Sequence, residues 1–446
     1  MRQVVIIGNG IAGITAARRI RQLTDDDITV ISGESDHFYS RTALMYIYMG
    51  HMRYEDTKPY EDHFWEKNRI RLKRAWVSQV NPEQKTLRFS DNTTLSYDVL
   101  IIATGSQPRK LHWPGCELTG VQGLYSLQDL ELMETNTKEI RQAVVIGGGL
   151  IGIEMAEMLH SRKIHVTFLV RESSFWNNVL PSEESTMITQ HIREQGIDLR
   201  LGVEVEKFTG NRNLKSVITK TGEEIPCAFA GITIGVQPNI SFLEGSGIQT
   251  KEGVLVDDYL STNIPDIYAI GDCAEHRTPI SHRKAIEQIW YTGRIMGETV
   301  AETICGHPKK YEPGPWFNSA KFFNIEYQVY GRVPATPQCD VSSFFWEDEK
   351  NNRILRLTYE PQTFSLKGIQ SLGIRLRQEV CKRWVTDSAP LEKVVSEWND
   401  ACFDPEFHNK PGMDWIKKLE QETGITFRPG KKSWKRIFKA ITHGQA

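Results

Sequence analysis

The chain has 446 residues, of which 54 are basic and 56 acidic, for a formal net charge of −2. This length allows two or three domains with large cores, and the ordinary shares of apolar and charged residues exclude a disordered chain, a collagen-like chain and a disulfide-stapled miniprotein. The near-neutral charge gives no indication of general nucleic-acid binding. The apolar runs are much shorter than the roughly 20 residues that a membrane span needs.

The start of the chain and its cysteines indicate the compartment. Residues 1–7 run straight into a glycine-rich turn without a cleavable small-residue site, so we expect no signal peptide and a cytoplasmic protein. The seven cysteines form no CxxC or CxxxxC pair, which is typical of reduced and mostly buried thiols. Cysteine and histidine also never cluster at ligand spacing, so we predict no metal site.

Two βαβ units organise the chain. The apolar run at residues 4–7 predicts a buried parallel strand, the apolar spacing at 11–23 predicts a helix, and residues 28–31 predict a second strand. A second unit of the same type follows further along the chain. Its strand, helix and second strand are expected at residues 143–146, 150–160 and 166–170. The sequence therefore predicts two copies of one nucleotide-binding design.

Further elements are expected around these units. Additional strands are predicted at residues 87–89, 95–97, 99–103 and 268–270. The last hundred residues change character and contain a polar turn between two alternating segments. Strands are expected there at 342–346, 353–359 and 365–374, and helices at 391–398 and 414–421.

The first glycine-rich turn, GNGIAG at residues 8–13, follows a predicted strand and opens a helix. In such a turn one glycine permits the tight bend, a second lets the backbone approach a pyrophosphate, and a third lets the helix pack on the strand. The helix N-terminus then offers free N–H groups to phosphate. Glu34, just beyond the second strand, can accept hydrogen bonds from both ribose hydroxyls. These features predict a dinucleotide site.

The second glycine-rich turn, GGGLIG at residues 147–152, lies in the same setting. The acidic position after its second strand is less clear, because Val170 is followed by Arg171 and Glu172. Glu172 would serve NADH, whereas Arg171 would pair with a 2′-phosphate and favour NADPH. A third interpretation makes Arg171 an ordinary surface charge.

Two strand ends carry further signals. Residues 103–105 read Ala-Thr-Gly after one apolar strand, and a similar run ends at Gly235. Residues 271–272 read Gly-Asp after another strand. A carboxylate there can reach a ribityl hydroxyl, and the N-terminus of a small-residue helix expected beyond it can stabilise negative charge on a reduced ring.

In this order, the four motifs resemble the two-dinucleotide-binding flavoproteins of the pyridine nucleotide–disulfide oxidoreductase superfamily, over roughly residues 1–331. The resemblance implies an α/β fold with two Rossmann-like domains, the FAD domain being discontinuous, and an α+β C-terminal domain. It implies FAD at the first site, NADH or NADPH at the second, and hydride transfer between them. The expected domains are FAD-binding at 1–113 and 246–320, NAD(P)-binding at 114–245, and an interface domain at 321–446.

Residues 37–44 (HFYSRTAL) resemble a stretch beside the flavin in the branch without a redox-active disulfide. Rubredoxin and ferredoxin reductases and the flavin part of NADH-dependent nitrite reductases belong to that branch. No cysteine precedes Cys116, so a thiol relay at the flavin lacks its nucleophile. Cys273, beside the Gly-Asp motif, is interpreted as a small buried residue.

The resemblance also assigns roles to single residues. Glu154 would face the nicotinamide carboxamide, and Trp290 would shield the flavin or lie on the electron exit route. Arg41 would lie near the FAD pyrophosphate or ring. Structural alternatives stay open, namely a salt bridge for Glu154, a core aromatic for Trp290 and a surface role for Arg41. The expected cofactor-binding residues are Gly8, Gly10, Ile11, Ala12, Gly13, Glu34, Arg41, Val77, Ala103, Thr104, Gly105, Gly147, Gly149, Leu150, Ile151, Gly152, Glu154, Arg171, Glu172, Gly235, Gly271 and Asp272.

These features predict an FAD-dependent NAD(P)H oxidoreductase whose external acceptor is a small iron–sulfur (ferredoxin) or rubredoxin-type carrier. A peripheral type II NADH:quinone dehydrogenase and a flavin-bearing interaction protein are the alternatives. Residues 431–446 are basic and carry a helical apolar stripe. They fit a terminal helix packed on its own domain, a weak contact with the inner face of an anionic membrane, or a docking site for an acidic partner. A homodimer is left open as well.

Overall fold

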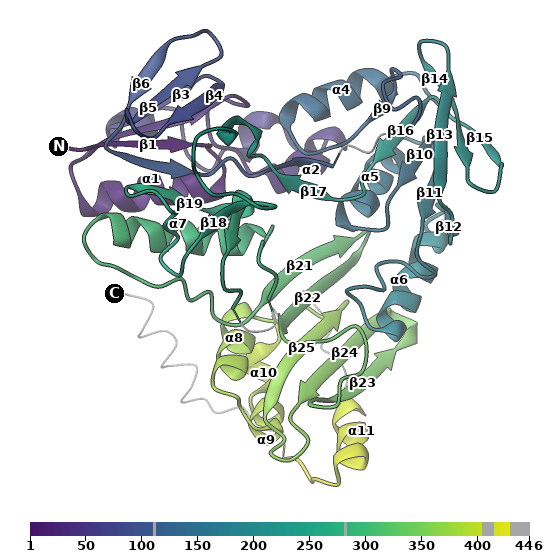
Figure 1. Ribbon diagram of the computed structural model, residues 1–446. Coiled ribbons are helices and arrows are strands. Elements are labelled where there is room, and N and C mark those ends of the chain that lie inside the picture. Colours follow the sequence, from purple (N-terminus) through teal and green to yellow (C-terminus); the bar gives the residue numbers. More distant parts are fainter. Residues whose placement is uncertain (110–112, 281–282, 404–413, 429–446) are drawn as a thin grey trace. The chain divides into compact units, whose positions relative to one another are not determined.

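The computed structural model describes residues 1–109, 113–280, 283–403 and 414–428 (Figure 1). Two compact units emerge from its contacts, one formed by Met1–Phe175 with His191–Pro313 and the other by Trp176–Gln190 with Gly314–Ala446. Within the described part of the chain, no helix combines the length and apolarity that crossing a bilayer requires. The tail at 431–446 lies outside the described residues, and so do the predictions made for it.

The first unit contains two parallel five-stranded sheets. One has the strand order β19-β7-β1-β2-β3 and is discontinuous in sequence, because β19 joins it late in the chain. Its strands are β1 (Gln3–Ile7), β2 (Asp27–Ser32), β3 (Ile70–Arg74), β7 (Val99–Ile102) and β19 (Ile267–Ala269). The central strands β1 and β7 are almost entirely buried, which explains why they read as continuous apolar runs.

The second parallel sheet has the order β12-β11-β10-β16-β9. Its strands are β9 (Val121–Gln122), β10 (Gln142–Ile146), β11 (His165–Val170), β12 (Asp198–Leu201) and β16 (Phe229–Ile232). The longer helices of this unit are α1 (Ile11–Leu23), α4 (Leu127–Thr137), α5 (Leu150–Ser161) and α7 (Trp290–Ile304), with part of α6 (Ser182–Glu194). The two sheets confirm the predicted α/β class with two Rossmann-like folds.

Smaller antiparallel elements complete the first unit. The strands are β4 (Val77–Asn81), β5 (Thr86–Phe89), β6 (Thr94–Ser96), β8 (Ser106–Pro108), β13 (Val205–Gly210), β14 (Leu214–Thr219), β15 (Glu224–Pro226), β17 (Val236–Pro238), β18 (Val254–Val256) and β20 (Ala274–His276). The short helices are η1 (Arg41–Ala43), α2 (Leu44–Tyr48), η2 (Tyr54–Thr57), α3 (His63–Lys67), η3 (Ser241–Leu243) and η4 (Gly271–Cys273). Strand β8 follows the first parallel sheet and β17 follows the second, and the two strands pair antiparallel in one two-stranded ribbon.

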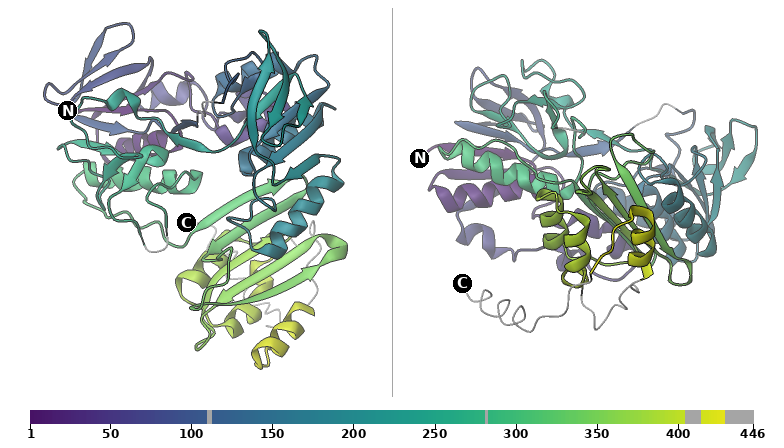
Figure 2. Two further views of the ribbon diagram at one scale, coloured as in Figure 1. Left: turned by 45° about the vertical axis from the view of Figure 1, so that its right-hand side comes forward. Right: turned by 90° about the horizontal axis from the view of Figure 1, so that it is seen from below.

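The second unit is a five-stranded antiparallel sheet of order β21-β22-β25-β24-β23 with short helices packed against it (Figure 2). The strands are β21 (Phe317–Phe322), β22 (Ile325–Gly331), β23 (Ser342–Asp348), β24 (Arg353–Tyr359) and β25 (Leu366–Leu372); the helices are η5 (Glu349–Asn351), α8 (Gln378–Thr386), α9 (Leu391–Ser396), α10 (Trp398–Ala401) and α11 (Asp414–Thr423). Trp384, Trp398 and Trp415 fill its core. The sequence predicts three of the five strands.

The division into two units, which follows contacts within the chain, does not correspond one to one with the three predicted domains. Both parallel sheets fall in one unit, and Trp176–Gln190 is assigned to the other. That segment is held there by a buried ion pair in which Nε of Arg356 donates to Glu184 at 2.6 Å. The boundaries between an FAD-binding, an NAD(P)-binding and an interface domain stay a prediction.

Candidate functional site

The first glycine turn joins β1 to α1, and its three glycines have three different surroundings. Gly8 has a φ of +116°, and a Cβ built on it would lie 2.1 Å from the carbonyl oxygen of Ala103. A Cβ on Gly13 would lie 2.1 Å from the carbonyl oxygen of Gly8. A Cβ on Gly10 would meet no atom within 4 Å. The fold therefore needs the first and third glycines, while the second opens onto a face that protein atoms leave clear.

The second glycine turn, between β10 and α5, repeats this pattern. Gly147 has a φ of +119°, and its Cβ would lie 2.6 Å from the carbonyl oxygen of Thr233. The Cβ of Gly152 would lie 2.1 Å from the carbonyl oxygen of Gly147, and that of Gly149 would meet nothing within 4 Å. Two open cradles at two helix N-termini fit two bound dinucleotides, because each offers close backbone approach and free N–H groups. Ile11 and Ala12 begin the first helix, and Leu150 and Ile151 the second.

The strand-end motifs converge on the first turn. Gly271 packs against the start of α1, where its Cβ would lie 3.0 Å from the Cβ of Ala12. The carboxylate of the adjacent Asp272 accepts a hydrogen bond from Oγ of Ser106 at 3.2 Å, one residue beyond Gly105. Burial raises the pKa of Asp272, although the hydrogen bond from Ser106 acts against this. The structure thus brings the first turn, the Ala-Thr-Gly motif and the Gly-Asp motif together.

One expectation for this region is wrong. No helix begins directly after Asp272, because η4 is a single turn and the chain continues as β20, which pairs parallel with β18. The next helix is α7, beginning at Trp290. Its Gly293 lies beside the same turn, since a Cβ there would be 3.5 Å from Ile11 and 3.8 Å from Cα of Gly271. The helix N-terminus near the site therefore belongs to α7.

Glu34 accepts more hydrogen bonds from the protein than the sequence suggests. Arg41 holds its two carboxylate oxygens at 2.9 and 2.6 Å, the N–H of Leu127 donates to it at 3.1 Å, and the hydroxyl of Tyr39 donates as well. Burial raises the pKa of Glu34, but Arg41 together with the donors from Tyr39 and Leu127 outweighs this effect and keeps that pKa below its ordinary value. Arg41 was expected near a pyrophosphate or the flavin ring. The structure places it beside Glu34, the expected ribose contact. A ribose hydroxyl that bonds to Glu34 would therefore share the carboxylate oxygens with Arg41.

Tyr125 is a site residue that sequence reasoning missed. Its main-chain oxygen accepts from Arg41 at 2.6 Å, its hydroxyl accepts from the N–H of Ser106 at 2.9 Å, and the same hydroxyl faces Asp272 at 3.5 Å. It therefore connects the Glu34 end of the site with the Asp272 end. The residue lies outside every motif, and the local sequence signal next to it is only the capping box that begins α4 at Ser126.

Glu154 sits in the second turn of α5 and is partly buried. Among the described residues its carboxyl group has no hydrogen bond or ion pair, so the alternative of a structural salt bridge finds no partner there. Burial and, secondarily, the nearby Glu157 raise its pKa to about 7. A carboxyl group poised near neutrality and left unpaired can donate or accept a hydrogen bond, as a carboxamide ligand requires.

The raised pKa of Glu154 predicts a pH-dependent stability. Between about pH 4.5 and pH 7 this carboxyl group is ionised only in the unfolded protein, so the free energy of unfolding falls as pH rises, by up to about 3 kcal/mol. Glu154→Gln stays neutral and lacks this loss. We expect the variant to exceed the wild type in stability at pH 8 and to match it at pH 4.5, in urea unfolding. Parallel pH profiles for the two proteins would contradict the prediction.

Trp290 begins α7, and Cys273 directly follows the Gly-Asp motif. Trp290 is the first residue of α7 and is partly exposed, with its ring edge-on to Tyr291 at 5.3 Å, so it is not a filled core position. Cys273 is fully buried, and its thiol donates to the main-chain oxygen of Ile270 at 3.3 Å. Burial also raises the pKa of that thiol, which makes it a poor nucleophile.

The remaining predicted residues, with the exception of Val77, follow strands of the two parallel sheets. Arg171 and Glu172 follow β11 and pair with each other at 3.0 Å, with the Arg171 side chain 73% exposed. Gly235 follows β16 with a φ of +106° and free space around its Cβ position. Thr104 donates through Oγ1 to the main-chain oxygen of residue 239 at 2.8 Å. Val77 begins β4, and no described contact joins it to Glu34 or to a glycine turn.

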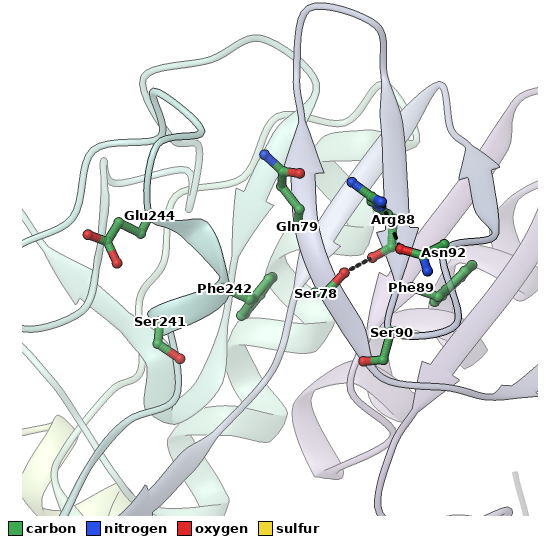
Figure 3. A pocket seen from close by; sticks show the side chains of 9 residues that line it. All are labelled: Ser78, Gln79, Arg88, Phe89, Ser90, Asn92, Ser241, Phe242 and Glu244. Atoms are coloured by element: carbon green, nitrogen blue, oxygen red, sulfur yellow. Dashed lines mark hydrogen bonds between the residues drawn. The ribbon is translucent and has the colours of Figure 1, made fainter.

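A separate pocket of about 680 Å³ lies between β4, β5 and η3 (Figure 3). Its lining is mostly polar and partly paired with itself, since Oγ of Ser78 donates to the main-chain oxygen of Arg88 and Arg88 donates to Asn92. None of the predicted site residues lines it. Within the described residues, no group of three or more His, Cys, Asp or Glu side chains is arranged to hold a metal ion.

Comparisons with known proteins identify relatives of this chain. Residues 2–289 match the family model described as pyridine nucleotide-disulphide oxidoreductase. The chain is 31% identical over 279 residues to the nitrite reductase [NAD(P)H] of Bacillus subtilis (strain 168), covering 62% of this chain but only 35% of that protein, about a third of its length. It is 27% identical over 307 residues to the rubredoxin-NAD(+) reductase of Ectopseudomonas oleovorans, covering 68% of this chain and 80% of that one.

Solved structures share the fold. The ferredoxin reductase for the CYP199A2 system from Rhodopseudomonas palustris superposes with a TM-score of 0.77 at 22% identity, covering 94% of this chain and all of that one. At this level of identity the likeness concerns the fold, and it extends to the antiparallel sheet of the second unit.

Proposed function

Since the chain belongs to the pyridine nucleotide-disulphide oxidoreductase family and uses FAD and NAD(P)H, we propose that it passes electrons from the nicotinamide nucleotide to a small iron–sulfur or rubredoxin-type carrier without a cysteine relay. The observation that carries the proposal is the duplicated glycine cradle. Gly10 and Gly149 each open onto protein-free space at a helix N-terminus, within one compact unit. Relatives named for nitrite and rubredoxin reduction support an external acceptor.

The residues of the first cradle would hold FAD. The N–H groups of the first turn of α1 would bind its pyrophosphate. The carboxylate of Asp272, oriented by Ser106 and Tyr125, would accept a hydrogen bond from a ribityl hydroxyl. Glu34 would accept hydrogen bonds from the ribose hydroxyls while its carboxylate oxygens also accept hydrogen bonds from Arg41. Bound FAD supplies the hydride acceptance and the release of single electrons that side chains cannot provide.

The residues of the second cradle would hold the nicotinamide nucleotide. The N-terminus of α5 would bind its pyrophosphate beside Gly149, and Glu154 would orient the carboxamide through its unpaired carboxyl group. Trp290, partly exposed at the start of α7, would shield the reacting centre from water. Cys273 takes no part, because its thiol is buried and hydrogen-bonded to the backbone.

Anaerobic titration of the purified protein with NADH and NADPH tests this proposal. We expect a flavin absorbance band that one of the two nucleotides bleaches, followed by turnover when a rubredoxin or a [2Fe–2S] ferredoxin is added. A colourless protein, or a flavin that neither nucleotide bleaches, would overturn the proposal and favour a flavin-bearing interaction protein. Bleaching followed by turnover only with a soluble quinone would favour the quinone dehydrogenase instead.

Arg171 is proposed to select the nucleotide. Its exposed guanidinium can leave Glu172 for a 2′-phosphate, and a charge-assisted contact of this kind changes affinity by roughly tenfold or more. We expect Arg171→Glu to raise the dissociation constant of NADPH by that factor and to leave that of NADH within about twofold. Arg71→Glu, a similarly exposed ion-paired arginine on β3, is the charge-matched control. An unchanged ratio of the two constants would remove Arg171 as the selector.

A further inference from the structure

Three helices of the first unit meet at one arginine. Arg162 caps the end of α5, and its guanidinium reaches both α2, which packs against α5, and α4, which packs against α2 (Figure 1). Nε and Nη2 donate to the main-chain oxygen of Tyr48 at 3.0 and 2.5 Å. Nη1 and Nη2 form a two-pronged contact with the carboxylate of Glu134 at 2.7 and 2.5 Å. The guanidinium carbon also lies 3.6 Å from the centre of the Tyr48 ring.

These contacts need an arginine in this position. Tyr48 is the last residue of α2, and its main-chain oxygen has no hydrogen-bond partner within the helix. The guanidinium of Arg162 supplies that hydrogen bond. A planar group with five donors can serve that oxygen and a carboxylate at once, whereas a lysine provides one point charge. Tyr48 itself is 1% exposed and is fixed at its far end. Its hydroxyl donates to Oγ1 of Thr137 at 2.7 Å, because Thr137 already donates its own proton to the main-chain oxygen of Met133.

Each of the three helices carries part of the proposed site. α2 follows directly from η1, which begins with Arg41. α4 begins at Leu127, whose N–H donates to Glu34. α5 carries Glu154, about 12 Å along the helix from Arg162 for a rise of 1.5 Å per residue. Arg162 therefore ties the helix that would orient the nicotinamide to the two helices that border the FAD site.

We propose that Arg162 is a positioning residue for hydride transfer. By fixing α5 to α2 and α4, it would set the separation of a nicotinamide held beside Glu154 from a flavin held beside Asp272. The inference rests on the proposed function, and Arg162 touches neither cofactor in it. A misplacement of about 1 Å lowers such a transfer by roughly a hundredfold. Loosening the contact should therefore slow the transfer far more than it weakens nucleotide binding.

The test compares two arginine variants. Arg162→Met keeps the aliphatic stem and removes every donor. Arg200→Met is the matched control, because the Arg200 side chain is also 32% exposed and is also ion-paired, with the carboxylates of Asp198 and Glu223, but it joins no helices. Three quantities are measured on the FAD-loaded proteins. They are the single-turnover rate of flavin bleaching at saturating NADH or NADPH, the calorimetric dissociation constant of the oxidised nucleotide, and the shift of the flavin spectrum when that nucleotide binds.

For Arg162→Met we expect bleaching to slow by about tenfold to a hundredfold, the dissociation constant to stay within about threefold, and the spectral shift to shrink. Arg200→Met should match the wild type in all three measurements. Arg162→Lys should recover only part of the rate, because it restores the charge without the planar donors. If Arg162→Met does not fold, Arg162→Lys and Glu134→Gln take its place, and we expect an intermediate loss of rate from each.

Two results would overturn the inference while leaving the proposed function intact. One is wild-type bleaching and a wild-type spectral shift in Arg162→Met, or in the two substitutes if that variant does not fold. The other is a loss of nucleotide affinity as large as the loss of rate, which would make Arg162 a support for binding alone. The wild type is measured first, and if neither nucleotide bleaches its flavin, the proposed function fails and the inference fails with it.

Discussion

Replacing Gly10 with valine is expected to give a folded protein that retains no FAD. A Cβ at this position meets no protein atom within 4 Å, and the backbone has a φ of −70°, which any residue adopts. The side chain would instead fill the space through which backbone approaches a pyrophosphate. Valine is also a poor N-cap, so the free energy of unfolding of the apoprotein should fall by about 1 kcal/mol. Absorbance of the purified variant measures bound flavin, which we expect below roughly a tenth of the wild-type content.

Gly13→Val is the control that separates loss of folding from loss of FAD binding. There a Cβ would lie 2.1 Å from the carbonyl oxygen of Gly8, so α1 cannot pack on β1 and the protein should fail to fold. Circular dichroism separates the two variants, because the Gly10 variant keeps its helical signal. A Gly10→Val protein that purifies yellow at full occupancy would show that the first turn does not hold the cofactor.

Replacing Gly149 with valine is expected to give the complementary result, a yellow protein that neither nucleotide reduces. Its surroundings match those of Gly10, with no atom within 4 Å of a Cβ and an unstrained backbone. The added side chain would block the nucleotide pyrophosphate at the start of α5 while leaving the first turn untouched. Anaerobic bleaching at millimolar NADH or NADPH measures the effect, and we expect a loss of at least about a hundredfold in rate.

The two valine variants control for each other. Gly149→Val must retain flavin for its loss of reduction to be informative, and Gly10→Val must retain nucleotide binding, which calorimetry on the apoprotein can measure. Flavin loss in the Gly149 variant would mean that the two cradles are not independent. Normal bleaching of the Gly149 variant would contradict the assignment of the second cradle to the nicotinamide nucleotide.

Several elements follow the sequence closely. The helix expected at 11–23 is α1, and the strands expected at 143–146 and 166–170 fall within β10 and β11. These segments combine a glycine turn with strong apolar runs or helical spacing, so local signals agree with the final packing. The nine-residue helix α8 is not predicted, because only three of its residues are buried, and this leaves too short an apolar pattern.

The wrong expectation after Asp272 has the opposite cause. Small residues such as Ala274 favour a helix in isolation, yet this segment forms β20 because β18, more than a dozen residues earlier, offers a parallel partner. Strand formation depends on which neighbour tertiary structure supplies, and a single sequence does not contain that information.

By itself the sequence determined the two glycine turns and which of their glycines the fold needs, because a strand, a tight turn and a helix are specified by residues close together in the chain. Only the tertiary structure decided which side chains surround them. Tyr125 meets Asp272 across 147 positions, and Arg162 meets Tyr48 across 114. Contacts of this kind leave no periodicity in the sequence, since they depend on how the sheets and helices stack once their local forms are set.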